Sequence, residues 1–259
     1  MRRFIDLSVE LDDTPAERVP VRIRRVDHRA GAREMAELFG VPEGDLPEGL
    51  GWAGEELTLI THAGTHMDAP WHYGPRVAGA PAPTISEVPL DWCYAPGVVL
   101  DLSHKRDGDE ITPADLELAL RRAGHRLAAG DIVLLRTGAD AHWGTPGYPE
   151  RGSGLDREGL LWLLERGVRV IGIDAWGMDR PFSVMRRRYE ETGDVRAIWP
   201  THFAGRGHAY CQLEKLAHLD RLPPTGFQVL CFPVKVARAG AGWTRVVAMI
   251  EEPAAAEEV

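Results

Sequence analysis

The sequence predicts a mixed α/β fold in which a mixed β-sheet or barrel forms the core and helices surround it. Three observations support this fold class. Seven short segments are rich in β-branched residues or leucine and are bounded by Gly, Pro or Asp, which is typical of strands. Three other segments carry helix-capping signals. Helices and strands alternate through the middle of the chain, so we expect one mixed domain.

The individual elements follow from these local signals. Strands are expected at residues 4–9, 57–61, 98–102, 132–136, 168–173, 227–236 and 245–250. Thr112 and Pro113 begin a helix that ends before Gly124. A second helix follows Asp156 over 157–166, and a third covers 182–191. Residues 12–55 receive no element, and so long a loop in a compact domain usually has a functional or interface role.

Composition narrows the class of protein. The 259 residues are expected to form a single domain over 1–252, followed by a flexible tail at 253–259 that lacks large apolar residues. A net charge of −9 opposes nucleic-acid binding. Three scattered cysteines favour neither a disulfide framework nor a zinc ribbon. No apolar run is long enough for a bilayer and no secretory signal is recognisable, so we expect a cytoplasmic protein without membrane partners.

One segment concentrates side chains that bind metals. Within eleven residues, four such side chains occupy even positions: His62, His66, Asp68 and His72. An extended chain would project all four toward one face. Gly64 and Pro70 oppose a helix here, so we place residues 62–68 on or just after a strand that enters a turn at 69–70.

The ligand chemistry of this segment suits a divalent cation. Two imidazoles and a carboxylate can hold Zn, Mn or Fe(II) and leave coordination positions open. His72 is either a further ligand or a free imidazole that works as acid and base near neutral pH. The alternative is a polar strand whose histidines make ordinary hydrogen bonds. The chain has only ten histidines, and three of them lie at even positions within these eleven residues, which favours the metal site.

The string His-x-Gly-Thr-His-x-Asp-x-Pro-x-His at 62–72 resembles the signature of the cyclase superfamily, which includes bacterial kynurenine formamidases, isatin hydrolase and aromatic polyketide cyclases. The resemblance extends to residues 5–8, 131–138, 172–174 and 214–220. It implies a swivelling β/β/α-type fold and one or two divalent ions per chain, Zn or Mn. It also implies assembly as a homodimer or homotetramer.

The resemblance also assigns roles to residues of this sequence. The first metal would be held by His62, His66 and Asp68, and Asp68 would bridge to a second metal. His72 would be the catalytic acid/base. The second metal would be held by His202 and Glu214, with His208 as a rival for His202.

Two departures from the formamidases guide the expected reaction. The chain looks longer at 12–55 and carries an inserted segment, 177–200, whose Phe182, Tyr189 and Trp199 could cap or line a pocket for a larger ligand. Residues 84–102 look more like the polyketide-cyclase-type members.

From these departures we favour an aromatic polyketide cyclase. It would close a ring of a small carbonyl substrate by aldol chemistry and dehydration, through a metal-stabilised enolate. A hydrolase of an amide, formamide or lactone is the alternative at the same site. A binding module without catalysis is the third possibility.

Overall fold

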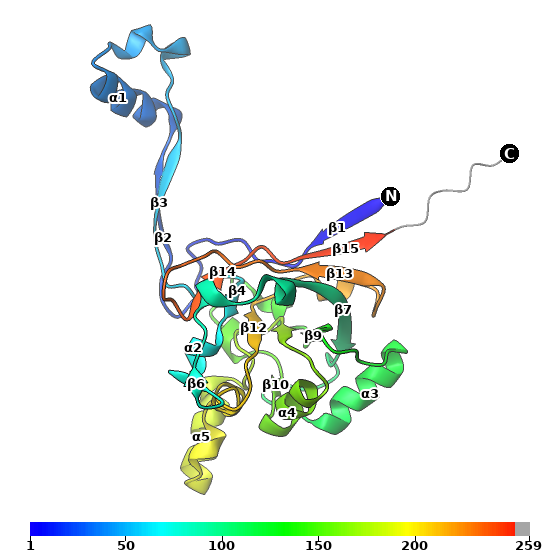
Figure 1. Cartoon of the computed structure of the whole chain (residues 1–259). Helices are drawn as coiled ribbons and strands as arrows, with labels where there is room; N and C mark the ends of the chain where they lie inside the picture. The colour runs from blue at the N-terminus through cyan, green and yellow to red at the C-terminus, as the bar shows by residue number, and fades with distance from the viewer. Residues whose placement is uncertain (252–259) are drawn as a thin grey trace, which may run out of the picture.

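A nine-stranded mixed sheet organises the computed structural model, which describes residues 1–251 (Figure 1). The strands, in their order across the sheet, are β1 (Arg2–Asp6), β15 (Val247–Glu251), β13 (Phe227–Leu230), β7 (Tyr94–Asp101), β9 (Ile132–Arg136), β11 (Val170–Ile173), β12 (Cys211–Glu214), β4 (His66–Asp68) and β14 (Ala241–Trp243). Neighbouring strands from β7 to β12 run parallel, and the pairs on either side are antiparallel. The predicted mixed α/β fold is confirmed.

The centre of the sheet is buried on both faces. In β9, Val133 and Leu135 pack into one hydrophobic core with α3 (Pro113–Ala123) and α4 (Arg157–Glu165), while Ile132 and Leu134 pack into a second core on the other face. Successive side chains of a strand point to opposite faces, so a strand buried on both faces reads as a continuous apolar run. That is why residues 132–136 were recognisable from sequence.

Local signals located the three expected helices. The helix expected after Thr112 is α3, where the Thr112 side chain accepts a hydrogen bond from the Asp115 backbone N–H and Gly124 ends the helix in the left-handed conformation. The other two expected helices are α4 and α5 (Phe182–Thr192). Other short α-helices and strands around the sheet are α2 (Pro70–Tyr73), α6 (Pro200–Ala204), β5 (Arg76–Val77), β6 (Ala80–Pro81), β8 (Glu110–Ile111) and β10 (Gly154–Leu155).

Strand predictions failed where strands are short or interrupted. The strand expected over 227–236 ends at Leu230, and Pro233 cannot donate to a ladder beyond it. β12 and β14 were not predicted, since three or four residues are too few to show a period-two pattern, while β4 lies within the segment 62–68 that was placed on or just after a strand.

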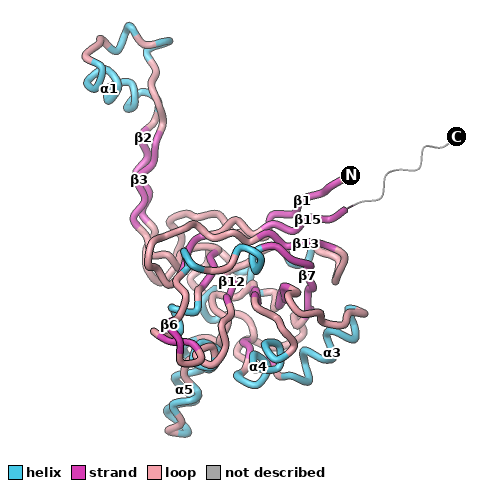
Figure 2. Tube along the Cα trace, viewed as in Figure 1, coloured by secondary structure: helices cyan, strands magenta, loops and turns pink. Residues whose placement is uncertain are grey.

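Residues 12–55 are not the loop that the sequence predicted. β2 (Arg22–Val26) pairs with β3 (Gly54–Thr58) as an antiparallel ribbon, and α1 (His28–Phe39) lies at its tip. This arm projects from the body of the molecule (Figures 1 and 2). The capping signals of α1 are present in the sequence: the Asp27 side chain accepts a hydrogen bond from Ala30 N at 2.8 Å, and Gly40 is left-handed. The strand expected at 57–61 is therefore displaced toward β3, which pairs within the arm.

The tail expected at 253–259 lies outside the described residues, and a single domain over 1–252 stays a prediction. Among residues 1–251, no helix has both the length and the apolar character needed to span a bilayer.

Candidate metal centre

The motif side chains converge through three different local structures. His66 and Asp68 lie on β4, His62 lies in the turn before it, and His72 lies in α2. Of the segment 62–68 that was expected on or just after a strand, only residues 66–68 are extended, and the turn expected at 69–70 is the start of α2. Gly64, with φ of +59°, turns the chain so that the rings of His62 and His66 lie with centroids 5.0 Å apart.

The short helix α2 directs His72 back toward the strand. Its first residue is Pro70, whose fixed φ suits the first helical position. His72 Nε2 consequently lies 3.8 Å from Asp68 Oδ2.

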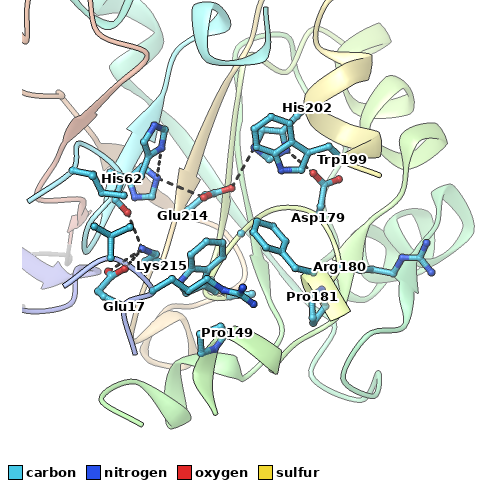
Figure 3. Close-up of a pocket in the computed structure, with 18 of the residues that line it drawn as sticks. Glu17, His62, Pro149, Asp179, Arg180, Pro181, Trp199, His202, Glu214 and Lys215 are labelled. Carbon is cyan, nitrogen blue, oxygen red and sulfur yellow. Dashed lines mark hydrogen bonds and ion pairs between the residues drawn. The ribbon is translucent and has the colours of Figure 1, made fainter. Parts of the chain in front are cut away.

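Two elements distant in sequence complete the centre. β12 pairs with β4 so that Glu214 stands opposite His66, and Glu214 Oε2 lies 3.5 Å from His66 Nε2. His202, on α6, places its Nε2 3.8 Å from Asp68 Oδ2 and 4.0 Å from Glu214 Oε1. Figure 3 shows His62, His202 and Glu214 converging on one cavity. His208, the rival for His202, is exposed and lies outside this cluster.

Asp68 provides the test of whether a cation fits here. Its side chain is fully buried, and among the described residues neither carboxylate oxygen accepts a hydrogen bond of good geometry. Imidazole nitrogens lie nearby instead, with His62 Nδ1 2.9 Å and His66 Nε2 3.4 Å from Oδ1. A buried carboxylate without hydrogen bonds is costly unless a positive charge compensates it. The residues therefore fit a divalent metal.

The donor atoms fall into two groups that share Asp68. One contains His62, Asp68 and His72, and the other contains His66, Asp68 and Glu214; within each group the donor atoms lie within 4.8 Å of one another. The resemblance paired His62 with His66 instead. Sharing of Asp68 agrees with the bridging role implied by the resemblance. The geometry is compatible with His72 either as a ligand or as the acid/base.

Burial and neighbouring charges tune the protonation of these groups. Burial lowers the pKa of His72 to about 4, so its imidazole is neutral near pH 7 and can accept a proton or bind a metal. Burial raises the pKa of Glu214, and the charge of Asp68 raises it further. For His202, burial lowers the pKa, but the carboxylates of Asp179, Glu214 and Asp68 together raise it, and the net shift is upward.

Asp179 is a site residue that sequence reasoning missed. Its Oδ2 accepts a hydrogen bond from His202 Nδ1 at 2.5 Å, and its Oδ1 accepts two at 2.8 Å from Thr201 N and Oγ1. A carboxylate in this position fixes the orientation of an imidazole and leaves Nε2 free for the metal. The Trp199 ring stacks against the His202 ring, with their centroids 4.3 Å apart. No spacing pattern links Asp179 to His202 in the sequence.

The centre lies at the base of a cavity of about 310 Å³. The walls of this cavity are largely apolar, and they include Ile60, Pro149, Trp176, Phe182 and Trp199 (Figure 3). Phe182 and Trp199 come from the segment 177–200 and line the cavity as expected. Tyr189 from the same segment does not, since it lies 45% exposed on α5.

Comparisons with known proteins agree with the fold and identify the family. The putative cyclase family matches residues 5–180. Isatin hydrolase A from Labrenzia aggregata, solved with benzyl benzoate bound, is 25% identical with a TM-score of 0.73, over 97% of this chain and 94% of that chain. Isatin hydrolase A from Ralstonia solanacearum is also 25% identical, with a TM-score of 0.75 over 96% of this chain and 92% of that one.

A third solved structure, described as a potential metal-dependent hydrolase with cyclase activity, shares the fold at 21% identity. Its TM-score is 0.61, over 98% of this chain and all of the other. The family match covers most of the chain and contains the whole 62–72 motif. The chain therefore belongs to the putative cyclase family and is an enzyme of that family.

Proposed function

We propose that this enzyme is a metal-dependent hydrolase that cleaves an amide, formamide or lactone bond in a small aromatic carbonyl substrate. The observation that carries the proposal is Asp68, a buried carboxylate that accepts no hydrogen bond from the described residues and is shared by two groups of donors whose side chains line an aromatic-walled cavity. The similarity to two isatin hydrolases favours hydrolysis.

The cavity is large enough for a small-molecule substrate. Ligand pockets range from roughly 300 to 1,000 Å³, and this one, at about 310 Å³, lies at the lower end of that range.

Each part of the site has a separate task in this reaction. His62, His66, Asp68, His202 and Glu214 would hold the metal, Zn or Mn. A divalent ion there polarises a carbonyl and lowers the pKa of water. The neutral His72 accepts a proton at Nε2 from the attacking nucleophile and returns it to the leaving group. The apolar walls stack the substrate ring and exclude bulk water.

Ring closure of an aromatic polyketide is the second candidate. It would use the same metal ligands and the same proton transfer at His72, with a carbon nucleophile in place of water. The aromatic wall contributed by Phe182 and Trp199 supports it, as does the resemblance of residues 84–102. We rank it second because the two similar structures with a named reaction are isatin hydrolases.

The test combines metal content with two activities. Protein purified without added metal is analysed for metal per chain, loaded with Zn or Mn, and assayed with isatin, an N-formyl arylamine and an aryl lactone. We expect one or two ions per chain and hydrolysis of at least one compound. If His72 is the acid/base and not a metal ligand, His72→Ala should keep the metal and lose turnover. His208 is exposed, so His208→Ala should match the parent in metal content and turnover.

The other outcomes separate the candidates. Cyclisation of an aryl poly-β-ketone without any hydrolysis would establish the second candidate. Failure to bind Zn or Mn at all would contradict both.

We further propose that the chain assembles as a homodimer or homotetramer through the arm. The tip of the arm exposes large apolar side chains, namely Leu38 (66%), Phe39 (61%) and Trp52 (42%). Exposed apolar clusters of this kind usually mark protein interfaces. Light scattering after size exclusion should give the mass of two or four chains, and Leu38→Ser with Phe39→Ser should lower it. A monomeric parent would contradict this proposal.

A further inference from the structure

Lys215 has an unusual position beside the metal centre. It directly follows Glu214, is 1% exposed and has a φ of +57°. Successive side chains of an extended strand point to opposite faces, but the left-handed backbone at Lys215 breaks the alternation. Glu214 and Lys215 consequently line the same cavity (Figure 3). L side chains rarely adopt this conformation, and it persists where the surroundings hold it.

The ammonium group of Lys215 is fully engaged by the protein. Nζ donates to both carboxylate oxygens of Glu17, at 2.8 and 2.7 Å, and to the carbonyl oxygen of His62 at 2.7 Å. An ammonium has three protons, so no donor remains for a substrate. The side chains of Lys215 and Glu17 are 2% and 3% exposed. A substrate-binding role for Lys215 is thus disfavoured, although it lines the cavity.

The same ion pair holds the turn that carries the first histidines. Glu17 Oε1 also accepts a hydrogen bond from Gly64 N at 2.7 Å. The carbonyl oxygen of Gly64 in turn lies 2.9 Å from His66 Nδ1, which orients the ring so that Nε2 lies 3.4 Å from Asp68 Oδ1. The pair therefore contacts the backbone of His62 and, through Gly64, the ring of His66.

Other hydrogen bonds hold the flanks of the turn, where Ala63 N donates to Ile60 O at 3.1 Å and Thr65 Oγ1 donates to Lys215 O at 2.6 Å. His62 itself precedes β4 and, among the described residues, lies outside any ladder, so the Lys215 ammonium on its carbonyl oxygen is the contact that fixes its backbone. The Asp179–His202 contact shows that another histidine of the centre is oriented by a carboxylate directly on its ring.

We propose that the buried Lys215–Glu17 ion pair is the positioning element of the metal centre, which fixes the 62–64 turn and thereby sets the imidazoles of His62 and His66 against Asp68. Lys215 and Glu17 are positioning residues and do not touch the substrate. The inference rests on the proposed function, because it requires these histidines to be metal ligands.

The experiment measures metal binding and ligand geometry, not only turnover. Apoprotein of the parent, Glu17→Gln and Lys215→Met is titrated with Zn²⁺ against a chelator, and the visible absorption spectrum of each Co²⁺-loaded protein is recorded. Glutamine offers one acceptor oxygen for the two donors that Glu17 Oε1 serves, and its NH₂ group faces the ammonium. We expect a 10- to 100-fold loss of Zn²⁺ affinity, the usual effect of removing groups that orient metal ligands, and an altered Co²⁺ spectrum.

A matched control separates positioning from general destabilisation. Lys105 forms an ion pair with Asp115 at 2.9 Å, partly buried and outside the cavity. Lys105→Met should keep the parent's Zn²⁺ affinity and Co²⁺ spectrum. If it lost affinity to the same extent, the effect would be one of stability and the inference would be overturned.

The remaining outcomes are equally distinct. A folded Glu17→Gln with the parent's affinity and spectrum overturns the inference, and this variant decides the matter where Lys215→Met does not fold. A parent protein that binds neither Zn²⁺ nor Co²⁺ contradicts the proposed function itself. A parent that binds both ions, together with unaffected variants, contradicts only the positioning role.

Discussion

Substitution of Asp68 by asparagine removes one negative charge from the centre and leaves the side chain almost the same size. Asp68 belongs to both groups of donors, so the change should weaken every metal site that these residues form. The new amide NH₂ group would also face imidazole nitrogens that now lie 2.9 and 3.4 Å from Oδ1. We expect loss of metal and activity together.

The magnitude follows from linkage between binding and folding. A ligand at 100 times its Kd stabilises the folded state by about 2.7 kcal/mol. In a chain of this size each kcal/mol raises the Tm by about 2 to 4 °C. The parent should therefore gain about 5 to 10 °C with Zn²⁺ at that concentration, whereas Asp68→Asn should gain less than about 1 °C.

Thermal unfolding with and without metal, combined with elemental analysis, measures both quantities. Comparing each protein with its own metal-free form cancels any change in intrinsic stability. Asp101→Asn is the control, because Asp101 accepts hydrogen bonds from Ser103 N and Arg136, and none of these three residues lines the cavity. A full complement of metal in Asp68→Asn, or a Tm gain of several degrees, would refute the assignment of Asp68 as a ligand.

Three further predictions concern stability and orientation. Burial raises the pKa of Asp174 to about 6, so the folded protein binds this proton more tightly than the unfolded chain does. The unfolding free energy of the parent, measured with urea, should therefore fall by about 3 kcal/mol relative to that of Asp174→Asn as the pH rises from about 4 to about 6. A difference between the two proteins that stays constant with pH would contradict this. Leu134→Ala, at a fully buried position of β9, should lower the urea-derived free energy by about 2 to 5 kcal/mol, and a loss below about 1 kcal/mol would argue against tight packing there. Asp179→Asn should weaken metal binding about 10- to 100-fold in a chelator titration, whereas Asp101→Asn should bind metal like the parent.

The local part of the fold could be predicted because its signals span a few residues. Thr112 with Gly124, and the apolar run at 132–136, each identify an element without help from the rest of the chain. The arm shows the limit of this reading. Asp27 and Gly40 do mark α1, but the helix packs on a ribbon whose strands lie 28 residues or more apart in the sequence, and that pairing has no local signature.

The sequence by itself determined the chemistry of the site: the donor types at 62–72, their fit to a divalent metal and the cyclase-type signature. Only the tertiary structure decided how those donors meet. The turn at Gly64 and the register of β12 against β4 bring His62 and Glu214 to Asp68, and they place Glu17 and Asp179 behind the histidines. Strand register and loop packing depend on contacts between residues far apart in sequence, so no local pattern specifies them.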